Sequence, residues 1–241
     1  MRRGLNDEIE VAAVLPMNEP MPKLKNIIAN SSLFKMLDDD QLEQIVAGTN
    51  YTRISANTNI VNHGDIASGA FWLVYGQVKI ALNTKNGNEK VLEILGRNTC
   101  FGLGEMLLDR PHLAFVKTTI DSMLLHTDRE AILRVAEHNF AFSRELMTCV
   151  GRQFCGLVRD IESYSQTARQ RLAGYLLRQS QRETSEDIEL VANKALIASR
   201  LSLTPETLSR LFHDFSANGL ISISGRHIKI LDYERMSSEL M

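Results

Sequence analysis

Three polar residues near the end of the chain have the types and spacing that suit the reading of base-pair edges. Glu206, Ser209 and Arg210 lie in the stretch SLTPETLSRLF (202–212), so in a helix they share one face. Arginine can donate twice to guanine, glutamate can accept from cytosine, and serine can do either. The simpler alternative is a surface ion pair between Glu206 and Arg210, which would contribute only about 0.3–0.5 kcal/mol.

The flanking residues predict the helix that presents these side chains. Thr204 is a suitable N-cap, and Pro205 at the first helical position loses no hydrogen bond that the helix needs. A buried apolar stripe follows at helical spacing, formed by Leu208, Leu211, Phe212 and Phe215. The three polar residues lie off this stripe, so we expect them to face solvent.

The surrounding elements predict a winged helix-turn-helix at residues 165–241. NKALIASRL (193–201) is a short amphipathic helix, and SLT is the tight turn that follows it. ISISGRHIKIL (221–231) alternates apolar and polar residues about the turn Ser224-Gly225-Arg226, which predicts a hairpin. Lys194, Arg226 and His227 should then lie near DNA phosphates, where they add salt-dependent affinity.

The rest of the chain indicates an α+β protein with three further parts. Residues 1–23 contain Pro16, Pro20 and Pro22 and are predicted to form a flexible arm. Residues 24–127 are predicted to form an effector-binding domain that begins with helical spacing. From about 51 to 125, short branched and aromatic runs broken by glycines predict an antiparallel β-roll of the jelly-roll kind, with a hairpin turn at Asn86-Gly87. Residues 128–164 are predicted to be helical.

An apolar stripe on that long helix predicts a seam between two copies of the chain. Its residues recur at steps of three and four: Leu146, Val150, Phe154, Leu157 and Ile161. The alternative is a helix that packs only on its own roll.

Composition excludes several classes of protein. The 241 residues are 44% hydrophobic and 23% charged, and no apolar run is long enough to span a membrane, so we expect a cytoplasmic protein. The three cysteines argue against a disulfide framework or a zinc ribbon. The net charge is −2, yet 194–231 contain five Lys or Arg and two acidic residues, which hints at a polyanionic partner.

Three stretches together resemble one family. LSLTPETLSRLFHDFSANGLISISGRHIKILD (201–232), NHGDIASGAFWLVYGQVKI (62–80) and CFGLGEMLLD (100–109) are similar to the recognition helix, the wing and the roll of the cyclic AMP receptor protein and fumarate–nitrate reduction regulator (CRP/FNR) superfamily. The resemblance covers the chain beyond about residue 25. It implies a homodimeric transcription regulator that binds double-stranded DNA and contacts RNA polymerase.

The resemblance also implies a DNA target. Glu206, Ser209 and Arg210 match the fumarate–nitrate branch, whereas the cyclic AMP branch usually has glycine in place of Ser209 and arginine in place of Pro205. The implied site is a two-fold one with TTGAT-like half-sites. Many relatives have glycine where Ser202 stands, and if the turn needs a positive φ there, serine costs roughly 1 kcal/mol.

Two effectors of the family are not expected. Relatives that bind cyclic nucleotides hold the phosphate with an Arg-Ser pair, and this chain has His112-Leu113 there, although Glu105 matches the ribose-binding glutamate. Leucine cannot neutralise a phosphate, and Arg110 lies on the other side of Pro111, so cyclic AMP is not the expected ligand. No cysteine precedes Cys100, which argues against the iron–sulfur cluster of the fumarate–nitrate branch.

The remaining resemblance is to the nitric-oxide-responsive Dnr-type denitrification regulators, carried by MLLDRPHLAFVKT (106–118) and LSLTPETLSRLFHDF (201–215). It implies a heme in the roll, with His112 or His63 as axial ligand and His126 or Cys100 as further candidates. Each has a plainer interpretation: His63 as a surface turn residue, His112 and His126 as structural residues, and Cys100 as a small buried hydrophobe.

Other functions remain open. Relatives respond to other small molecules or to none. A cupin-type metalloenzyme would use a similar roll, but it needs a His-x-His pair, and the sequence has none. With no nucleophile–base pair or phosphate-binding Gly-Lys-Ser/Thr loop, we do not expect an enzyme.

Overall fold

The computed structural model describes residues 24–240 except 85, 86, 88, 163, 164, 184, 186 and 191. These residues form two compact units. One contains the described residues up to Leu82 together with Leu92–Cys155, and the other contains Asn83–Val91 and the residues from Gly156 onward. The predicted arm at 1–23 and Asn86 of the expected turn lie outside the described residues.

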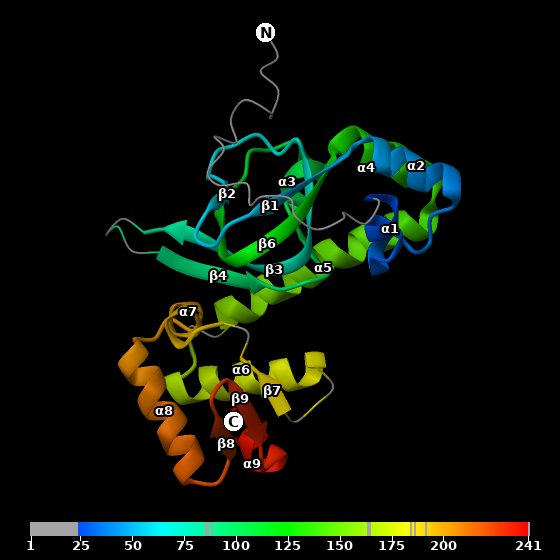
Figure 1. The fold of residues 1–241 in the computed structure, drawn as a ribbon. Coiled ribbons are helices and arrows are strands. Elements are labelled where there is room, and N and C mark those ends of the chain that lie inside the picture. The colour runs from blue at the N-terminus through cyan, green and yellow to red at the C-terminus, as the bar shows by residue number, and fades with distance from the viewer. Residues whose placement is uncertain are drawn as a thin grey trace. The chain divides into compact units, whose positions relative to one another are not determined.

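The first unit is built on the predicted antiparallel roll (Figure 1). Its two long strands are β3 (Gly69–Asn83) and β6 (Phe115–Asp128), which pair along most of their length. β1 (Thr49–Ile54) and β2 (Asn59–Val61) pair with β6, while β4 (Glu89–Leu95) and β5 (Thr99–Phe101) pair with β3.

Alternation along the long strands supplies two hydrophobic cores. In β3, Phe71 and Leu73 point into the interior of the roll, where Phe71 stacks on Phe101 with 4.9 Å between ring centroids. Trp72 points to the opposite face and packs edge-on against Phe34, 5.2 Å away, in the core shared with the helices. Burial on both faces explains why the sequence here is a continuous apolar run.

Helices close one end of the roll (Figure 1). They are α1 (Leu24–Ala29), the 3-10 helix η2 (Ser32–Phe34), α2 (Asp39–Ala47) and α4 (Arg129–His138), while α3 (Leu103–Leu108) follows β5. α2 begins with a capping box in which Asp38 accepts from the Gln41 amide at 2.8 Å.

The predicted single helix over 128–164 is two helices, α4 and α5 (Phe140–Glu162). The chain breaks at Asn139, which has extended φ/ψ of −131° and 99°. The Asn139 Oδ1 accepts from the Phe142 amide at 2.9 Å, and its Nδ2 donates to Gln41 at 2.7 Å. Asn139 therefore caps α5, and the new helix leaves in a different direction (Figure 1).

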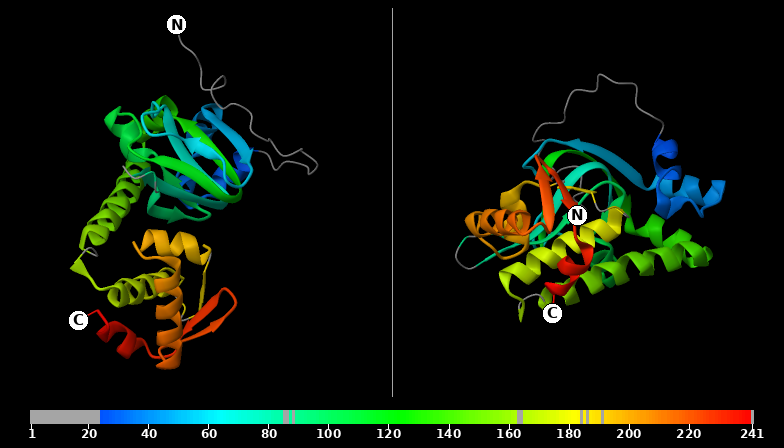
Figure 2. Two further views of the ribbon diagram at one scale, coloured as in Figure 1. Left: turned by 90° about the vertical axis from the view of Figure 1, so that its left-hand side faces the viewer. Right: turned by 90° about the horizontal axis from the view of Figure 1, so that it is seen from below.

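The second unit has the predicted winged helix-turn-helix. Its helices are α6 (Ala168–Glu183), α7 (Lys194–Arg200), α8 (Pro205–Ala217) and α9 (Tyr233–Ser238). A three-stranded sheet has the order β7 (Asp187–Glu189), β9 (His227–Ile230), β8 (Ile221–Ser224). Figure 2 shows the β8–β9 hairpin beside α8. Among the described residues, no helix is both long and apolar enough to cross a membrane.

Candidate nucleic-acid interface and effector site

α8 presents the three predicted base-reading residues to solvent. Thr204 is the N-cap, and its Oγ1 accepts from the Thr207 amide at 3.2 Å, with Pro205 in the first turn. Leu208, Phe212 and Phe215 are buried, whereas Glu206, Ser209 and Arg210 are exposed. Leu211, expected on the buried stripe, is only half-buried.

Glu206 interacts with its own helix end rather than with Arg210. Its carboxylate accepts from its own backbone N–H and from the Thr204 side chain, and both interactions lower its pKa. Within the described part of the chain, no ion pair joins Glu206 to Arg210. The carboxylate therefore stays anionic near neutral pH, and the Arg210 guanidinium has no carboxylate partner in this pair.

The turn before α8 has a positive φ at Ser202, the position where many relatives have glycine. Ser202 has a φ of 56°. Its amide donates to the Ser199 carbonyl at 3.2 Å, and the Leu203 amide donates to the Ala198 carbonyl at 2.9 Å. These two bonds form a Schellman motif with serine at the position that usually carries glycine. The motif turns the chain sharply from α7 into α8.

The residues assigned to phosphate contacts are exposed on the same unit. Lys194 begins α7, whose N-cap Asn193 accepts from the Leu196 amide at 2.8 Å, and the Lys194 Nζ lies 5.7 Å from the centre of the Phe212 ring. Arg226 and His227 are exposed at the hairpin turn, where Gly225 has a φ of 63°. Lys194 is thus close to α8, and the other two residues lie on the wing.

β7, which was not predicted from the sequence, adds an acidic residue beside the wing. β7 pairs antiparallel with β9, and the Asp187 Oδ1 lies 3.8 Å from the His227 Nδ1. A carboxylate therefore lies beside one of the residues assigned to phosphate contacts. The alternation Asp187-Ile188-Glu189-Leu190, with only the apolar residues buried, was the signal that could have revealed the strand.

The predicted dimer seam divides between two faces of α5. Leu146 is only 3% exposed and Val150 is half-buried, and both pack in the core of their own unit, so they are not available to a partner. Phe154, Leu157 and Ile161 are exposed, as predicted for a seam. For the first two residues, the alternative of a helix packed on its own roll was therefore correct.

Phe154, Leu157 and Ile161 belong to a longer exposed stripe that runs the length of α5. Phe140, Met147, Phe154 and Ile161 recur every seven residues, and Leu157 and Val158 lie beside them, all exposed. We call these six residues the α5 stripe. A seven-residue apolar repeat is the pattern of a coiled-coil seam. Phe140, Met147 and Val158 were not predicted, because the predicted seam began at Leu146 and Val150, which face the roll.

His112 is buried in the roll, while His63 is exposed in a turn. The His112 amide donates to the Asp65 carbonyl at 2.9 Å, and its carbonyl accepts from the Gly64 amide at 2.8 Å, so the turn containing His63 packs on the His112 backbone. A Cβ at Gly102 would lie 3.1 Å from the His112 Cε1, so glycine makes room for the ring. Burial lowers the pKa of His112, although Glu105 and Asp65 oppose this shift.

His126 lies close enough to His112 for their charges to interact. Its ring packs 4.7 Å from Phe71, centre to centre, and a Cβ at Gly69 would come within 2.7 Å of its Nε2. Burial lowers the pKa of His126, opposed by Asp128. Both imidazoles are therefore held neutral near neutral pH. Among the described residues, no cluster of three or more His, Cys, Asp or Glu side chains could hold a metal ion.

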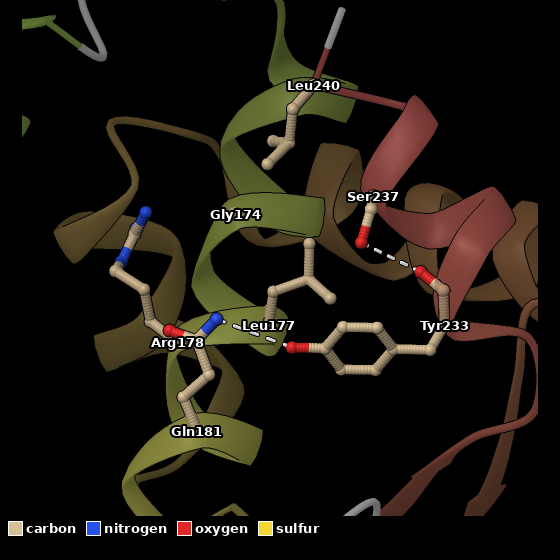
Figure 3. Close-up of a pocket in the computed structure, with 7 residues that line it drawn as sticks. All are labelled: Gly174, Leu177, Arg178, Gln181, Tyr233, Ser237 and Leu240. Atoms are coloured by element: carbon tan, nitrogen blue, oxygen red, sulfur yellow. Dashed lines mark hydrogen bonds between the residues drawn. The ribbon is translucent and has the colours of Figure 1, made fainter.

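A pocket of about 340 Å³ that was not predicted lies between α6 and α9 (Figure 3). Its lining residues include Leu177, Arg178 and Leu240. The Gln181 amide donates to the Tyr233 hydroxyl at 3.4 Å across it, and the Ser237 hydroxyl donates to the Tyr233 carbonyl at 2.8 Å.

Comparisons with known proteins agree with this architecture. A cyclic nucleotide-binding domain matches residues 51–139, and a Crp-like helix-turn-helix domain matches residues 170–238. The fumarate and nitrate reduction regulatory protein of Vibrio cholerae is 25% identical over 203 residues, which cover 82% of this chain and 80% of that protein. The CRP-like cAMP-activated global transcriptional regulator of Mycobacterium tuberculosis is 21% identical over 89% of this chain and 98% of its own length.

Two further matches differ in extent. A cGMP-dependent protein kinase of Plasmodium berghei is 27% identical over 114 residues, which cover 47% of this chain but only 13% of the kinase. The structure of FixK2 from Bradyrhizobium japonicum has a TM-score of 0.71 at 20% identity and covers 79% of this chain and 96% of that chain, which supports the fold. A roll followed by a Crp-like helix-turn-helix, matched in this order, shows that the chain belongs to the CRP/FNR superfamily of DNA-binding transcription regulators.

Proposed function

We propose that the protein is a homodimeric transcription regulator that binds two-fold DNA sites with TTGAT-like half-sites. The observation that carries the proposal is the exposed set of Glu206, Ser209 and Arg210 in the first turns of a capped α8. In helix-turn-helix proteins the first turns of the second helix meet base edges in the major groove. The branch whose spacing these three residues match suggests the half-site.

The α5 stripe supports the homodimer. Two-fold DNA sites need two recognition helices, with half-sites about one helical turn or roughly 34 Å apart. A second copy of the chain would cover an apolar repeat that one copy leaves exposed. RNA polymerase as a partner and the cytoplasm as location are parts of the same proposal.

A binding assay with a TTGAT-N4-ATCAA duplex tests the proposed target. We expect tight binding to this duplex and weak, salt-sensitive binding to a scrambled duplex of the same length. Equal affinity for both sequences would reject the half-site. A scan of randomised duplexes would then show whether any other two-fold sequence is preferred, and a flat result would reject sequence-specific binding altogether.

For the effector, we propose nitric oxide sensed through a heme in the roll, with His112 as the residue that would hold the heme. A neutral imidazole is the ligand form of histidine, and burial keeps His112 neutral. Exposed apolar residues surround its segment: Ile66, which bridges to Pro111, Leu108 and Leu113. Such residues suit a flat apolar group, which supports the proposal of a heme there. The exposed His63 fits less well.

In this proposal, heme iron supplies the group that binds the gas, and the protein supplies the rest. His112 would hold the iron through its ring, and Ile66, Leu108 and Leu113 would cover the apolar face and exclude water. With no cation at the His112-Leu113 position, the same site is not expected to hold the phosphate of cyclic AMP. An iron–sulfur cluster and catalytic activity are likewise not part of the proposal.

Heme titration followed by absorbance tests the effector proposal separately from DNA binding. We expect a stoichiometric Soret band in the wild type that His112→Ala removes and His63→Ala leaves intact. Loss of the band in His63→Ala but not in His112→Ala would move the ligand to the turn. A wild-type protein that takes up no stoichiometric heme would reject heme, and a ligand screen that includes cyclic AMP would then address a different small molecule.

A further inference from the structure

Two of the three cysteines meet where β5 lies against α5. Cys100 on β5 and Cys149 on α5 are both partly buried and pack against the same apolar cluster, which includes Leu103 and Leu146. The two thiols lie close enough to interact, and each is the strongest influence on the pKa of the other. No part of the proposed DNA or effector function uses this pair.

A second contact holds the same arrangement. Gln153 lies one turn beyond Cys149 on α5, and its Nε2 donates to the Cys100 backbone carbonyl at 3.0 Å. Residues four positions apart lie on the same face of a helix. The Gln153 bond therefore fixes α5 against β5 in the register that brings the Cys149 thiol to Cys100.

The surroundings assign different roles to the two thiols. The interaction with the Cys100 thiol lowers the pKa of Cys149, and the nearby Arg152 acts in the same direction, whereas burial and Glu145 oppose them. The same interaction and burial raise the pKa of Cys100. A thiolate is the reactive form of cysteine, so Cys149 is the nucleophile of the pair and Cys100 is the second thiol.

We propose that Cys100 and Cys149 are a peroxide-reactive thiol pair that forms a disulfide between β5 and α5. The Cys149 thiolate attacks one oxygen of hydrogen peroxide, the O–O bond breaks, and the hydroxide that leaves takes up a proton to become water. The Cys149 sulfenic acid is then attacked by the Cys100 sulfur, which loses its proton as the second hydroxide leaves as water. The pair loses two electrons, and the peroxide is reduced to two waters.

Cys155 provides an internal control on the same helix. Six residues along a helix separate Cys149 from Cys155 by about 9 Å of rise, which exceeds the span of roughly 7 Å that a disulfide can bridge. While α5 is intact, Cys155 cannot pair with Cys149 in the same chain. In the unfolded chain the opposite holds, because the shorter loop between Cys149 and Cys155 closes more readily.

The first experiment treats the reduced full-length protein with stoichiometric hydrogen peroxide, alkylates the remaining thiols and measures the intact mass. We expect the number of alkylated cysteines to fall from three to one. Peptide mapping should then find a Cys100–Cys149 cross-link and an alkylated Cys155. The same treatment in guanidinium chloride should give mainly Cys149–Cys155.

Variants then distinguish the roles of the thiols. Cys155→Ser should still form the cross-link, and Cys100→Ser should leave a sulfenic acid on Cys149 that dimedone labels. The proposal is overturned if all three wild-type cysteines remain alkylatable after peroxide, or if the native disulfide involves Cys155. Because the wild-type result stands without the variants, a variant that fails to fold does not remove the test.

Discussion

At the scale of single residues, Arg210 and Lys194 are cations with different expected tasks. Arg210 projects from the exposed face of α8, where a guanidinium can donate to a base edge, while Lys194 lies at the start of α7. A cation on a phosphate adds affinity for any sequence, and a cation on a base edge adds preference for one sequence.

Replacing each of these residues by alanine should separate the two tasks. Arg210→Ala should weaken binding to the specific duplex by about 1–3 kcal/mol and relax the preference at one base position. Lys194→Ala should weaken binding to all duplexes alike and reduce the salt dependence of the affinity. The measurement is the affinity for the specific and scrambled duplexes at several salt concentrations. Equal effects of the two variants on sequence preference would contradict the assignment.

His112 and His126 make the stability of the roll depend on pH. Burial lowers the pKa of both residues below the value near 6.5 that they have in the unfolded chain. As the pH falls below about 6.5, His112 and His126 bind protons in the unfolded chain but remain neutral in the folded roll, so the free energy of unfolding decreases.

Trp72, the one tryptophan of the chain, is buried between the roll and its helices and reports the unfolding of this unit by fluorescence. The denaturant concentration at the midpoint of unfolding should decrease as the pH is lowered from about 7.5 to about 5.5. His112→Gln should flatten this decrease, and His63→Gln at the exposed turn should not. A wild-type midpoint that stays constant over this range would refute the argument.

At the scale of elements, α5 packs one face into a hydrophobic core and leaves another apolar face exposed. Leu146 and Val150 belong to the core of the roll, while the α5 stripe is exposed from Phe140 to Ile161. Asn139 starts this helix independently of α4, so its direction is set by its own cap and packing.

A charge in the α5 stripe should therefore oppose self-association. Phe154 is 64% exposed in one chain, so Phe154→Lys removes little from the core of the chain and should shift a dimer towards monomer. Arg152→Ala, on the same helix but off the stripe, should not. Sedimentation equilibrium at several concentrations measures the difference. A Phe154→Lys protein with the wild-type dissociation constant would exclude this stripe as the seam.

The sequence predicted those elements whose signals are local. The Thr204 cap, Pro205 and the buried Leu208, Phe212 and Phe215 define α8 by spacing alone, and Gly225 marks the wing turn. The sequence predicted the cost of serine at Ser202 if the turn had a positive φ, but it did not predict the φ itself. Features that depend on contacts between distant residues were not predicted. The helix break at Asn139 is held by hydrogen bonds to Met36 and Gln41, and β7 forms by pairing with β9. Leu146 faces inward because the roll packs against that side of α5.

At the scale of the whole molecule, the arrangement of the DNA site is the sharpest test of a two-fold regulator. If two chains bind together, their recognition helices must meet the same side of the duplex. Inserting five base pairs between the TTGAT-like half-sites rotates one of them by about half a helical turn. We expect the affinity to fall towards that of a single half-site. Unchanged affinity in a gel-shift titration would mean that each half-site is bound independently.

The α5 stripe also makes the thermal stability of the protein depend on its concentration. An isolated chain would leave six large apolar side chains wetted along one helix, and only association would remove them from water. The melting temperature should therefore climb as the protein is concentrated and drop as it is diluted. In a regulator of this kind, the protein concentration would therefore set both the stability of the fold and the fraction of DNA sites that are bound.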